Sequence, residues 1–305
     1  MPRAPAVVEC VPNVSEGCDW AVIERLALTI RSAGARLANV HTDPDHHRSV
    51  FSFLGRPDVV RAAALALAAE TLAAVDMRGH HGAHPRLGAL DVLPFVPLDG
   101  ITMDEVAALA HEVGRMLGER HQVPVYFYGV AAMRDDRRRL PDARRGGYEA
   151  LAARLMTTEG RPDAGPARFD PRAGAILVGA RTVLVAYNVW LASTDLEIAR
   201  SIARSVREAS GGLPAVQAMA VSLASRGLVQ VSMNLLDYRR TPIPVAFDAV
   251  WQESERHGVA VLQGELVGLA PRAAFAGRTP ESAGLVGFTD DLFLDDHLEQ
   301  VLRGQ

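Results

Sequence analysis

Residues 76–97 read DMRGHHGAHPRLGALDVLPFVP, and this stretch sets three histidines, His80, His81 and His84, directly ahead of an apolar run. The glycines and the proline among them oppose a regular helix, and glycine lets a backbone approach a ligand closely. The apolar run, residues 89–97, predicts a buried strand. We therefore expect the histidines on a loop anchored at the start of a strand, where catalytic and binding residues often lie.

Histidine is the side chain whose ordinary pKa lies closest to neutral pH, so it can carry a proton under physiological conditions. For His80 and His81 the default expectation is a solvent-exposed loop residue. His84 lies between a glycine-rich turn and Pro85-Arg86, and this position favours a functional role.

The composition bounds the class of protein. The chain has 305 residues, of which 49% are hydrophobic and 22% charged, as expected for a soluble globular protein with one large or two medium domains. Its net charge of -4 argues against general binding of nucleic acid or of an acidic membrane surface. Its two cysteines are too few for a disulfide framework. No apolar run suits a membrane span or a secretory signal, so we expect a cytoplasmic protein.

Strand and helix patterns alternate along the chain. In two places, residues 36–42 with 48–54 and residues 216–223 with 228–235, successive strands adjoin as in hairpins. Strict alternation would favour a doubly wound parallel sheet. The hairpins instead favour an α+β fold of ferredoxin-like units with mixed sheets.

Residues 159–174, EGRPDAGPARFDPRAG, are rich in Gly and Pro and lack a hydrophobic period, so they are the clearest linker candidate. We expect an N-terminal subdomain over residues 1–178, which holds the histidine-rich loop, and a C-terminal subdomain over residues 179–305.

Polar residues follow several of the predicted strands. They form four clusters, at residues 13–16, 41–48 and 80–86, and at Tyr128 with the basic loop 134–145 behind it. Strand ends in such sheets converge on one edge, where ligands bind, so we expect one polar site. The basic loop has six arginines interleaved with aspartates. A solvated loop is the default for it, and binding of carboxylates is the alternative.

The run HTDPDH, from His41 to His46, suggests a competing metal site. It approximates the HxHxDH run of metallo-β-lactamase-type hydrolases, with His41, Asp43, Asp45 and His46 as ligands for zinc or manganese. A polar turn or a substrate contact is favoured over metal, because Asp-Pro and Pro-Asp are ordinary turn sequences. Phosphate-loop, dinucleotide-binding and GxSxG patterns are absent.

Seven segments resemble the glutamate formimidoyltransferases, that is, the formiminotransferase domain of formiminotransferase-cyclodeaminase. Together they span nearly all of residues 6–271. The segments are VECVPNVSEG (8–17), DPDHHRSVFSFLG (43–55), GAHPRLGALDVLPFVPL (82–98), VPVYFYG (123–129), GAILVGARTVLVAYNVWL (174–191), QVSMNLLDYRRTP (230–242) and ELVGLAP (265–271).

The resemblance implies transfer of a formimidoyl group from N-formimidoyl-L-glutamate to tetrahydrofolate, with release of glutamate, in histidine degradation and one-carbon metabolism. It also implies a homodimer of two-subdomain chains, with folate bound between the subdomains. By the family pattern His84 is the catalytic base. The folate- and substrate-binding residues that the resemblance implies are Gly165, Pro166, Ala167, Arg168, Phe169, Asp170, Pro171, Arg172, Ala173, Gly174, Gly211, Tyr128 and His41.

The chemistry of this reaction suits a histidine such as His84. The attacking amine nitrogen gains positive charge and must lose a proton, and the departing glutamate nitrogen must receive one. No metal or redox cofactor is needed for these steps. His47 stands where bacterial relatives often have Asn, and Val130 where Glu is common. These departures motivate an alternative, a non-catalytic folate-binding protein of the same fold.

Overall fold

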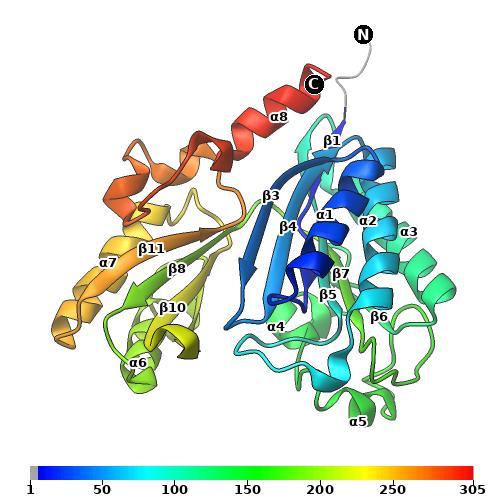
Figure 1. The fold of residues 1–305 in the computed structure, drawn as a ribbon, viewed down its shortest axis with the longest axis horizontal. Coiled ribbons are helices and arrows are strands. Elements are labelled where there is room, and N and C mark those ends of the chain that lie inside the picture. Colours follow the sequence, from blue (N-terminus) through cyan, green and yellow to red (C-terminus); the bar gives the residue numbers. More distant parts are fainter. Residues whose placement is uncertain (1–5, 305) are drawn as a thin grey trace. The chain divides into compact units, whose positions relative to one another are not determined.

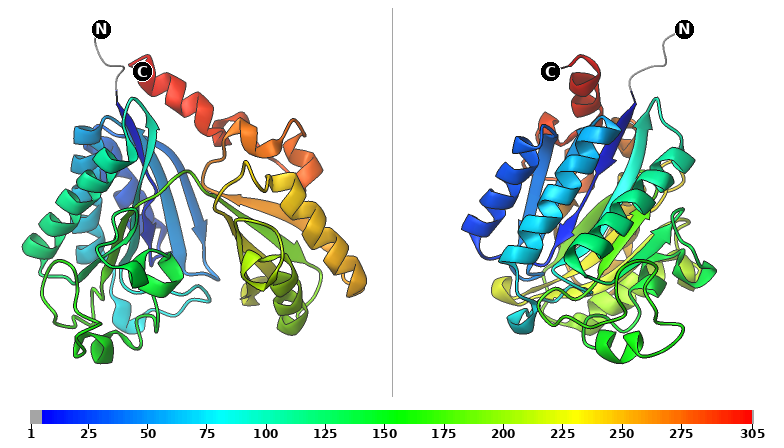
Figure 2. Two further views of the ribbon diagram at one scale, coloured as in Figure 1. Left: turned by 180° about the vertical axis from the view of Figure 1, so that it is seen from behind. Right: turned by 90° about the vertical axis from the view of Figure 1, so that its right-hand side faces the viewer.

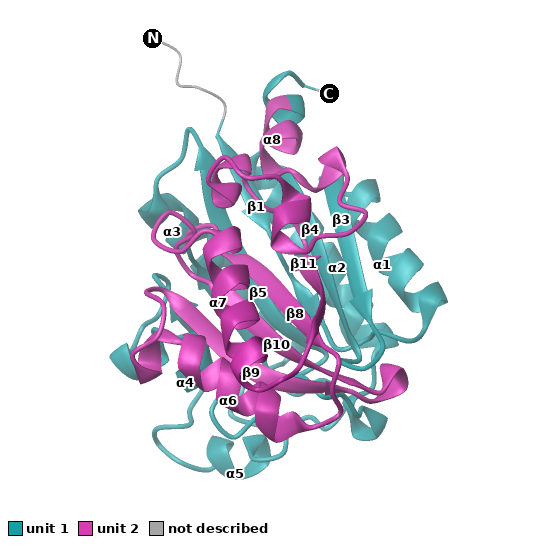
Figure 3. Ribbon diagram, turned by 90° about the vertical axis from the view of Figure 1, so that its left-hand side faces the viewer, with its two compact units in different colours: residues 1–181, 300–305 teal, residues 182–299 magenta. Residues whose placement is uncertain are grey.

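The structure is a computed structural model that describes residues 6–304. These residues divide into two compact units, coloured separately in Figure 3. Unit 1 holds the described residues up to Arg181 and from Gln300 onward, and unit 2 holds residues 182–299.

Unit 1 begins with a βαββαβ arrangement, the ferredoxin-like order of elements. Its strands pair antiparallel, with β4 next to β1 and β1 next to β5, while β3 lies outside β4 (Figure 1). A two-residue strand, β2, continues the path of β1 between β4 and β5. The bounds are β1 (Val7–Cys10), β2 (Asn13–Val14), α1 (Trp20–Ser32), β3 (Arg36–Asp43), β4 (Arg48–Gly55), α2 (Pro57–Ala74) and β5 (Leu90–Asp99).

Two further strands extend this sheet and make it mixed. Helix α3 (Met103–His121) leads to β6 (Val125–Gly129), and β7 (Ile176–Ala180) lies parallel to both β5 and β6, between them. The chain between β6 and β7 forms short helical turns on the way. They are η2 (Asp135–Arg137), α4 (Leu140–Ala143) and α5 (Leu151–Leu155), and η1 (Met77–Gly79) precedes β5.

Helices α1, α2 and α3 cover one face of this sheet (Figures 1 and 2). Their apolar sides and the facing strand residues form the main core. Asp19 caps α1, and Thr102 with Glu105 forms a complete capping box at the start of α3. The opposite face carries a smaller cluster, which packs strands β5 to β7 against the chain between β6 and β7. Its buried members are Leu87, Val92, Tyr126, Tyr128, Ala143, Leu151, Leu155, Ala175 and Leu177.

Unit 2 repeats the βαββαβ order with a sheet that is antiparallel throughout, in the order β11-β8-β10-β9. Helices α6 and α7 pack on this sheet around a second core. The bounds are β8 (Val185–Leu191), α6 (Leu196–Val206), η3 (Glu208–Ser210), β9 (Val216–Leu223), η4 (Ala224–Arg226), β10 (Leu228–Leu235), α7 (Ile243–Arg256), β11 (Val261–Val267), η5 (Arg272–Phe275), η6 (Pro280–Ala283), η7 (Asp290–Leu292) and α8 (Leu294–Leu302).

The α+β class is therefore confirmed, with the mixed sheet in unit 1. The linker assigned to residues 159–174 is wrong, because these residues pack within unit 1 and the chain enters unit 2 only after Arg181. Among the described residues, no helix combines the length and apolar character that crossing a membrane requires.

Candidate active site

The histidine loop, residues 76–89, lies side by side with residues 165–174. The backbone N–H of Met77 donates to the carbonyl of Arg172 at 3.0 Å, and that of Ala89 donates to Ala173 at 2.9 Å. Gly88 and Gly174 face each other across a bridge. A Cβ on Gly88 would lie 2.4 Å from the carbonyl oxygen of Ala175, so the close approach depends on glycine. Two segments about 90 positions apart in the chain thus form one surface.

The same loop is tied to the turn between β3 and β4. Ala83 N–H donates to the Asp45 carbonyl at 3.0 Å, and His80 Nε2 donates to the His47 carbonyl at 2.9 Å. In return His47 Nδ1 donates to the His81 carbonyl at 2.9 Å. These bonds hold the loop against the turn, so two of the four predicted polar clusters, at residues 41–48 and 80–86, lie together.

His84 is half-buried, and its Nδ1 lies 2.8 Å from the carbonyl oxygen of Pro85. A carbonyl oxygen only accepts, so Nδ1 carries the proton and Nε2 of the neutral ring keeps its lone pair. Burial, together with the positive charges of Arg48 and Arg144, lowers the pKa of His84 well below its ordinary value. At neutral pH the ring is therefore neutral and Nε2 can accept a proton.

Beside His84 lies a buried ion network centred on Asp91, which is fully buried. Asp91 Oδ2 accepts from Arg48 Nη1 at 2.8 Å and from Arg144 Nη2 at 2.7 Å, while Oδ1 accepts from the Leu87 N–H at 2.8 Å. Arg48 also donates to Asn13 Oδ1, at 3.0 Å from Nε and 2.7 Å from Nη2. Two guanidinium groups share one carboxylate, so the network has an excess positive charge next to His84.

Arg144 has one further unsatisfied donor. Its Nε is buried and has no hydrogen-bond partner among the described residues. A buried donor without a partner costs about 1–3 kcal/mol unless a ligand or a water molecule accepts from it. Together with the excess charge, this donor makes the network suited to an anionic ligand.

The three loop histidines differ in their environments. His80 is 5% exposed, its Nε2 donates to His47, and its Nδ1 accepts from Arg86 Nε at 3.1 Å. Both of its ring nitrogens are therefore engaged, and the expectation of a solvent-exposed residue is wrong for His80. His81 is exposed, as expected. Of the three, His84 is the one whose ring leaves a nitrogen lone pair for chemistry while lying beside the Asp91 network.

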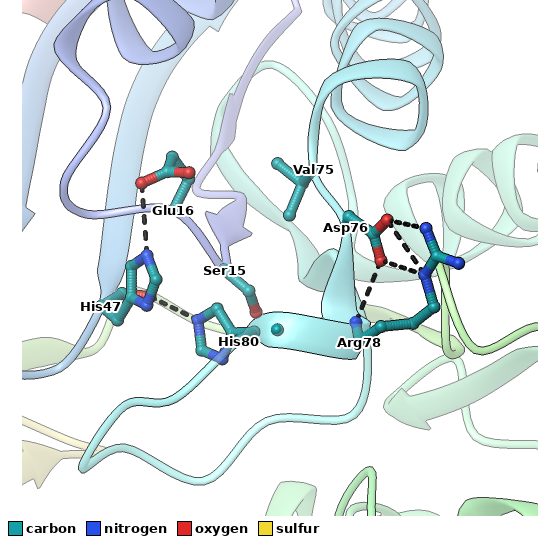
Figure 4. Close-up of a pocket in the computed structure, with 8 residues that line it drawn as sticks. Ser15, Glu16, His47, Val75, Asp76, Arg78 and His80 are labelled. Atoms are coloured by element: carbon teal, nitrogen blue, oxygen red, sulfur yellow. Dashed lines mark hydrogen bonds and ion pairs between the residues drawn. The ribbon is translucent and has the colours of Figure 1, made fainter.

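A cavity of about 570 Å³ lies between the end of β2 and η1, and His80 is among the residues that line it (Figure 4). The residues around it include Ser15, Glu16, His47, Val75, Asp76 and His80. Ser15 is itself fixed by a bond from its Oγ to the Gly88 carbonyl at 2.8 Å. The cavity therefore opens beside the histidine loop.

The other residues that the sequence singled out lie in varied settings. Phe169, in the 165–174 segment, has its ring centroid 5.5 Å from that of Tyr148. Tyr128 is buried in the smaller core cluster, and burial raises its pKa to about 12. His41 is half-buried on β3, and Gly211 is exposed in unit 2, after η3.

The run from His41 to His46 does not gather into a cluster of metal ligands in the described part of the chain. Instead the Asp43 carboxylate accepts from the His46 backbone N–H at 2.8 Å, which is the geometry of a polar turn. The His46 ring faces His84, with centroids 5.6 Å apart. Residues 43–46 therefore form the polar turn that the sequence favoured.

Sequence reasoning missed Asp91 and gave the arginines only a general role. The signal for Asp91 was present, because an aspartate inside the apolar run LGALDVLPFVP must be paired when that run is buried. The solvated-loop expectation is wrong for Arg144 and for Arg137. The Arg137 side chain is 2% exposed and binds Asp163 at 2.7 Å.

The fold of two ferredoxin-like units agrees with the matches to known families. The family model for the N-terminal subdomain of the formiminotransferase domain matches residues 7–181, and that for the formiminotransferase domain matches residues 186–279. The chain belongs to the formiminotransferase family.

Several curated relatives support this assignment. Formimidoyltransferase-cyclodeaminase of Gallus gallus is 43% identical over 275 residues, which is 88% of this chain and 51% of that protein. Glutamate formimidoyltransferase of Thermoplasma acidophilum is 39% identical over 298 residues, 97% of this chain and 98% of that protein. The glutamate formimidoyltransferase of Streptococcus pyogenes is 37% identical, covering 88% of this chain and 90% of its own length.

The chain thus spans about half the length of the Gallus gallus relative and nearly all of the Thermoplasma acidophilum relative. Among solved structures, the periplasmic protease PqqL from Escherichia coli matches at 9% identity and a TM-score of 0.19, over 98% of this chain and 40% of that one. A score this low supports no argument about fold or function.

Proposed function

We propose that this protein is a glutamate formimidoyltransferase, which moves the formimidoyl group of N-formimidoyl-L-glutamate to tetrahydrofolate and releases L-glutamate. The observation that carries the proposal is the state of His84. Its Nδ1 proton is held by the Pro85 carbonyl and its Nε2 is free to accept a proton, in a chain that belongs to the formiminotransferase family.

His84 acts as the base and then as the acid. The folate amine attacks the amidine carbon, a C–N bond forms, and Nε2 of His84 takes the proton that the amine nitrogen loses. The C–N bond to glutamate then breaks, and His84 returns the proton to the departing glutamate nitrogen. General acid–base help of this kind is typically worth about 10²–10⁴-fold in rate.

The Asp91 network supplies attraction for the substrates. Both substrates carry carboxylates, and Arg48 and Arg144 together exceed the charge of Asp91 by one. The unpaired Nε of Arg144 is a donor that a carboxylate oxygen would satisfy. A bound carboxylate would also offset the positive charge that lowers the pKa of His84, and so make Nε2 a stronger base in the complex.

Residues 165–174 are proposed to contact the folate, together with Gly211, Tyr128 and His41. Support comes from the position of the segment directly against the histidine loop and from the exposed and half-exposed side chains along it. Phe169 offers an aromatic face to a flat ring. Tetrahydrofolate is a co-substrate here, and we propose no metal for the reaction itself and a homodimer as the assembly.

The test is a spectroscopic assay for 5-formimidoyltetrahydrofolate, with N-formimidoyl-L-glutamate and N-formyl-L-glutamate as rival donors. Turnover with the formimidoyl donor that depends on His84 supports the proposal. Binding of tetrahydrofolate without turnover of either donor would contradict it and favour a non-catalytic folate-binding protein. Turnover with N-formyl-L-glutamate alone would show that the donor is the formyl compound, and the proposed role of His84 would be unchanged.

A further inference from the structure

A second cluster of reactive side chains lies at the His47–His80 stack. Glu16, Cys18 and His47 each present one potential metal ligand, and the three atoms lie within 4.8 Å of one another. Among residues 6–304, no other group of three His, Cys, Asp or Glu side chains has its potential ligand atoms this close together. The transferase chemistry described above uses none of the three.

The local backbone explains why the three side chains meet. Gly17 lies so close to the turn between β3 and β4 that a Cβ there would be 2.4 Å from both the Arg48 nitrogen and the Asp43 carbonyl oxygen. Glycine at this position lets the segment after β2 press against the turn. It therefore brings Glu16 and Cys18, one on each side of Gly17, next to His47.

The tautomer of a neutral His47 ring leaves a lone pair that faces the carboxylate. His47 Nδ1 donates to the His81 carbonyl at 2.9 Å, so in the neutral ring Nε2 is an acceptor. Nε2 lies 3.4 Å from Glu16 Oε1, visible at the upper left of Figure 4. In that state Nε2 and Oε1 are both acceptors, and their separation is longer than the ~2.7–2.9 Å of a charge-assisted hydrogen bond. A cation bound between them would accept a lone pair from each.

The distance also suits a specific cation. Two ligands bound at about 2.1 Å with a tetrahedral angle are about 3.4 Å apart, the geometry of zinc with nitrogen and oxygen ligands. Glu16 Oε1 is further oriented by the backbone N–H groups of Cys18 and Asp19, at 2.8 and 2.9 Å. A histidine whose second nitrogen is bound by a carbonyl is the usual arrangement of a metal ligand.

We propose that Glu16, Cys18 and His47 form a binding site for a thiophilic divalent cation of the zinc class, separate from the transfer chemistry. A thiolate, an imidazole and a carboxylate together favour Zn²⁺ over Mg²⁺ or Ca²⁺, which prefer oxygen ligands alone. Glu16 and His47 line the cavity of about 570 Å³, which leaves room for a water molecule as a fourth ligand.

Occupancy of this site would restrain the histidine loop. The His47 carbonyl accepts from His80, the two rings stack with centroids 4.3 Å apart, and His47 Nδ1 holds the His81 carbonyl. A cation that fixes His47 therefore stabilises the loop that carries His84. Because it binds the folded chain, it raises the melting temperature by mass action.

The experiment uses the full chain, stripped with a chelator and titrated with Co²⁺ and then with Zn²⁺. We expect one equivalent of Co²⁺ to give a near-ultraviolet thiolate-to-cobalt charge-transfer band, which Zn²⁺ abolishes by displacement. Cys18→Ser should remove the band and weaken Zn²⁺ binding by at least about 100-fold, beyond the 10–100-fold typical of losing an outer-shell partner. Since Cys18 is exposed, this variant should fold normally.

Two more variants complete the design. His47→Asn keeps a residue that tolerates the left-handed backbone at this position, where φ is 49°, and should also weaken Zn²⁺ binding. His81→Gln changes a neighbouring exposed histidine and should bind Zn²⁺ as the unmodified chain does. Zn²⁺ should raise the melting temperature of the unmodified chain and of His81→Gln, but not of Cys18→Ser. Absence of the cobalt band, or equal Zn²⁺ affinity in Cys18→Ser, would overturn the proposal.

Discussion

The bond from His84 Nδ1 to the Pro85 carbonyl decides which nitrogen of the ring can act as a base, and this makes a sharp prediction. His84→Ala should lower kcat by about 10²-fold or more, the loss expected for a general base. Affinity for tetrahydrofolate should change little, because the ring acts on the reacting nitrogen. Steady-state kinetics and a folate-binding titration check both expectations.

Neighbouring histidines provide the controls for His84. His81→Ala should leave kcat close to that of the unmodified enzyme, since its side chain is exposed. His80→Ala should mainly lower the melting temperature, because both nitrogens of His80 hold the loop. If His84→Ala keeps full turnover while one of the other two loses it, the base lies elsewhere on the loop.

The pH dependence follows from the same residue. Burial, with help from Arg48 and Arg144, lowers the pKa of His84, so the ring stays neutral to a more acidic pH than a free histidine does. Because the base must be unprotonated, kcat/KM should hold from neutral pH down past about 6.5 and fall only below it. A pH–rate profile of kcat/KM measures where this fall at acidic pH begins. A fall that begins above pH 7 would show that a different group, or a His84 of raised pKa, governs the free enzyme.

At the scale of single residues, the sequence singled out His84 as a candidate but did not predict which charged side chains pair with one another. His84 stood out because of its glycine-rich loop, whereas Asp91 took its importance from arginines 43 and 53 positions away along the chain. No local pattern links Arg48, Asp91 and Arg144. Only the fold brings the three together.

At the scale of elements, strand β1 carries a buried carboxyl group that makes stability depend on pH. Glu9 is 4% exposed, and burial, opposed by Arg181, raises its pKa from 4.5 to about 7. The unfolded chain releases this proton near pH 4.5 and the folded chain only near pH 7, so stability falls as the pH rises between these values. The full effect, present above pH 7, is on the order of 3 kcal/mol.

Glu9→Gln removes this dependence. We expect the free energy of unfolding of Glu9→Gln, relative to the unmodified chain, to be higher at pH 8 than at pH 5 by about 2.5 kcal/mol. Urea unfolding at the two pH values measures the difference. Glu24→Gln on the exposed side of α1 is the matched control and should show no such change. An equal effect of Glu9→Gln at both pH values would mean that Glu9 is ionised in the folded chain.

The segment 165–174 supports the histidine loop, and it is also the segment for which we propose a folate contact. Gly174 has a φ of 69°, and a Cβ there would lie 2.4 Å from the Leu87 carbonyl oxygen, so Gly174→Val would disturb the fold itself. Phe169→Ala is the better probe of the proposed folate contact. Its loss should weaken folate binding about 10-fold, the size of one aromatic contact, with a small change in melting temperature.

A folate titration and a thermal melt on the same variants separate the two roles. Met156→Ala, which changes an exposed side chain outside the segment, should alter neither quantity. Unchanged folate affinity in a well-folded Phe169→Ala would remove this residue from the folate site.

Elements themselves were largely predictable from local signals. The strands at residues 216–223 and 228–235 lie where the sequence placed them. The exception is residues 159–174. Glycine and proline mark irregular backbone, but they do not tell whether that backbone joins two units or packs within one.

At the scale of the whole molecule, the two units share the βαββαβ order, yet only unit 1 adds the parallel strands β6 and β7. This extension is what makes the site of unit 1 possible. It returns the chain between β6 and β7 across the smaller core and delivers Arg144 to Asp91. The sequence predicted the hairpins of both units, but strand order across the sheet depends on long-range pairing that no local pattern records.

The full reaction should proceed without a bound metal. The proton transfers that accompany C–N bond formation and cleavage are ones that His84 Nε2 can perform. The cluster of Glu16, Cys18 and His47 is assigned a role in stability, away from the reacting atoms. Exhaustive chelation should therefore leave kcat at its untreated value while lowering the melting temperature of a zinc-loaded sample. Metal analysis before and after treatment, with the transferase assay and a thermal melt, measures both. Loss of turnover that Zn²⁺ restores, and that Cys18→Ser reproduces, would contradict this prediction and move the cluster into the catalytic machinery.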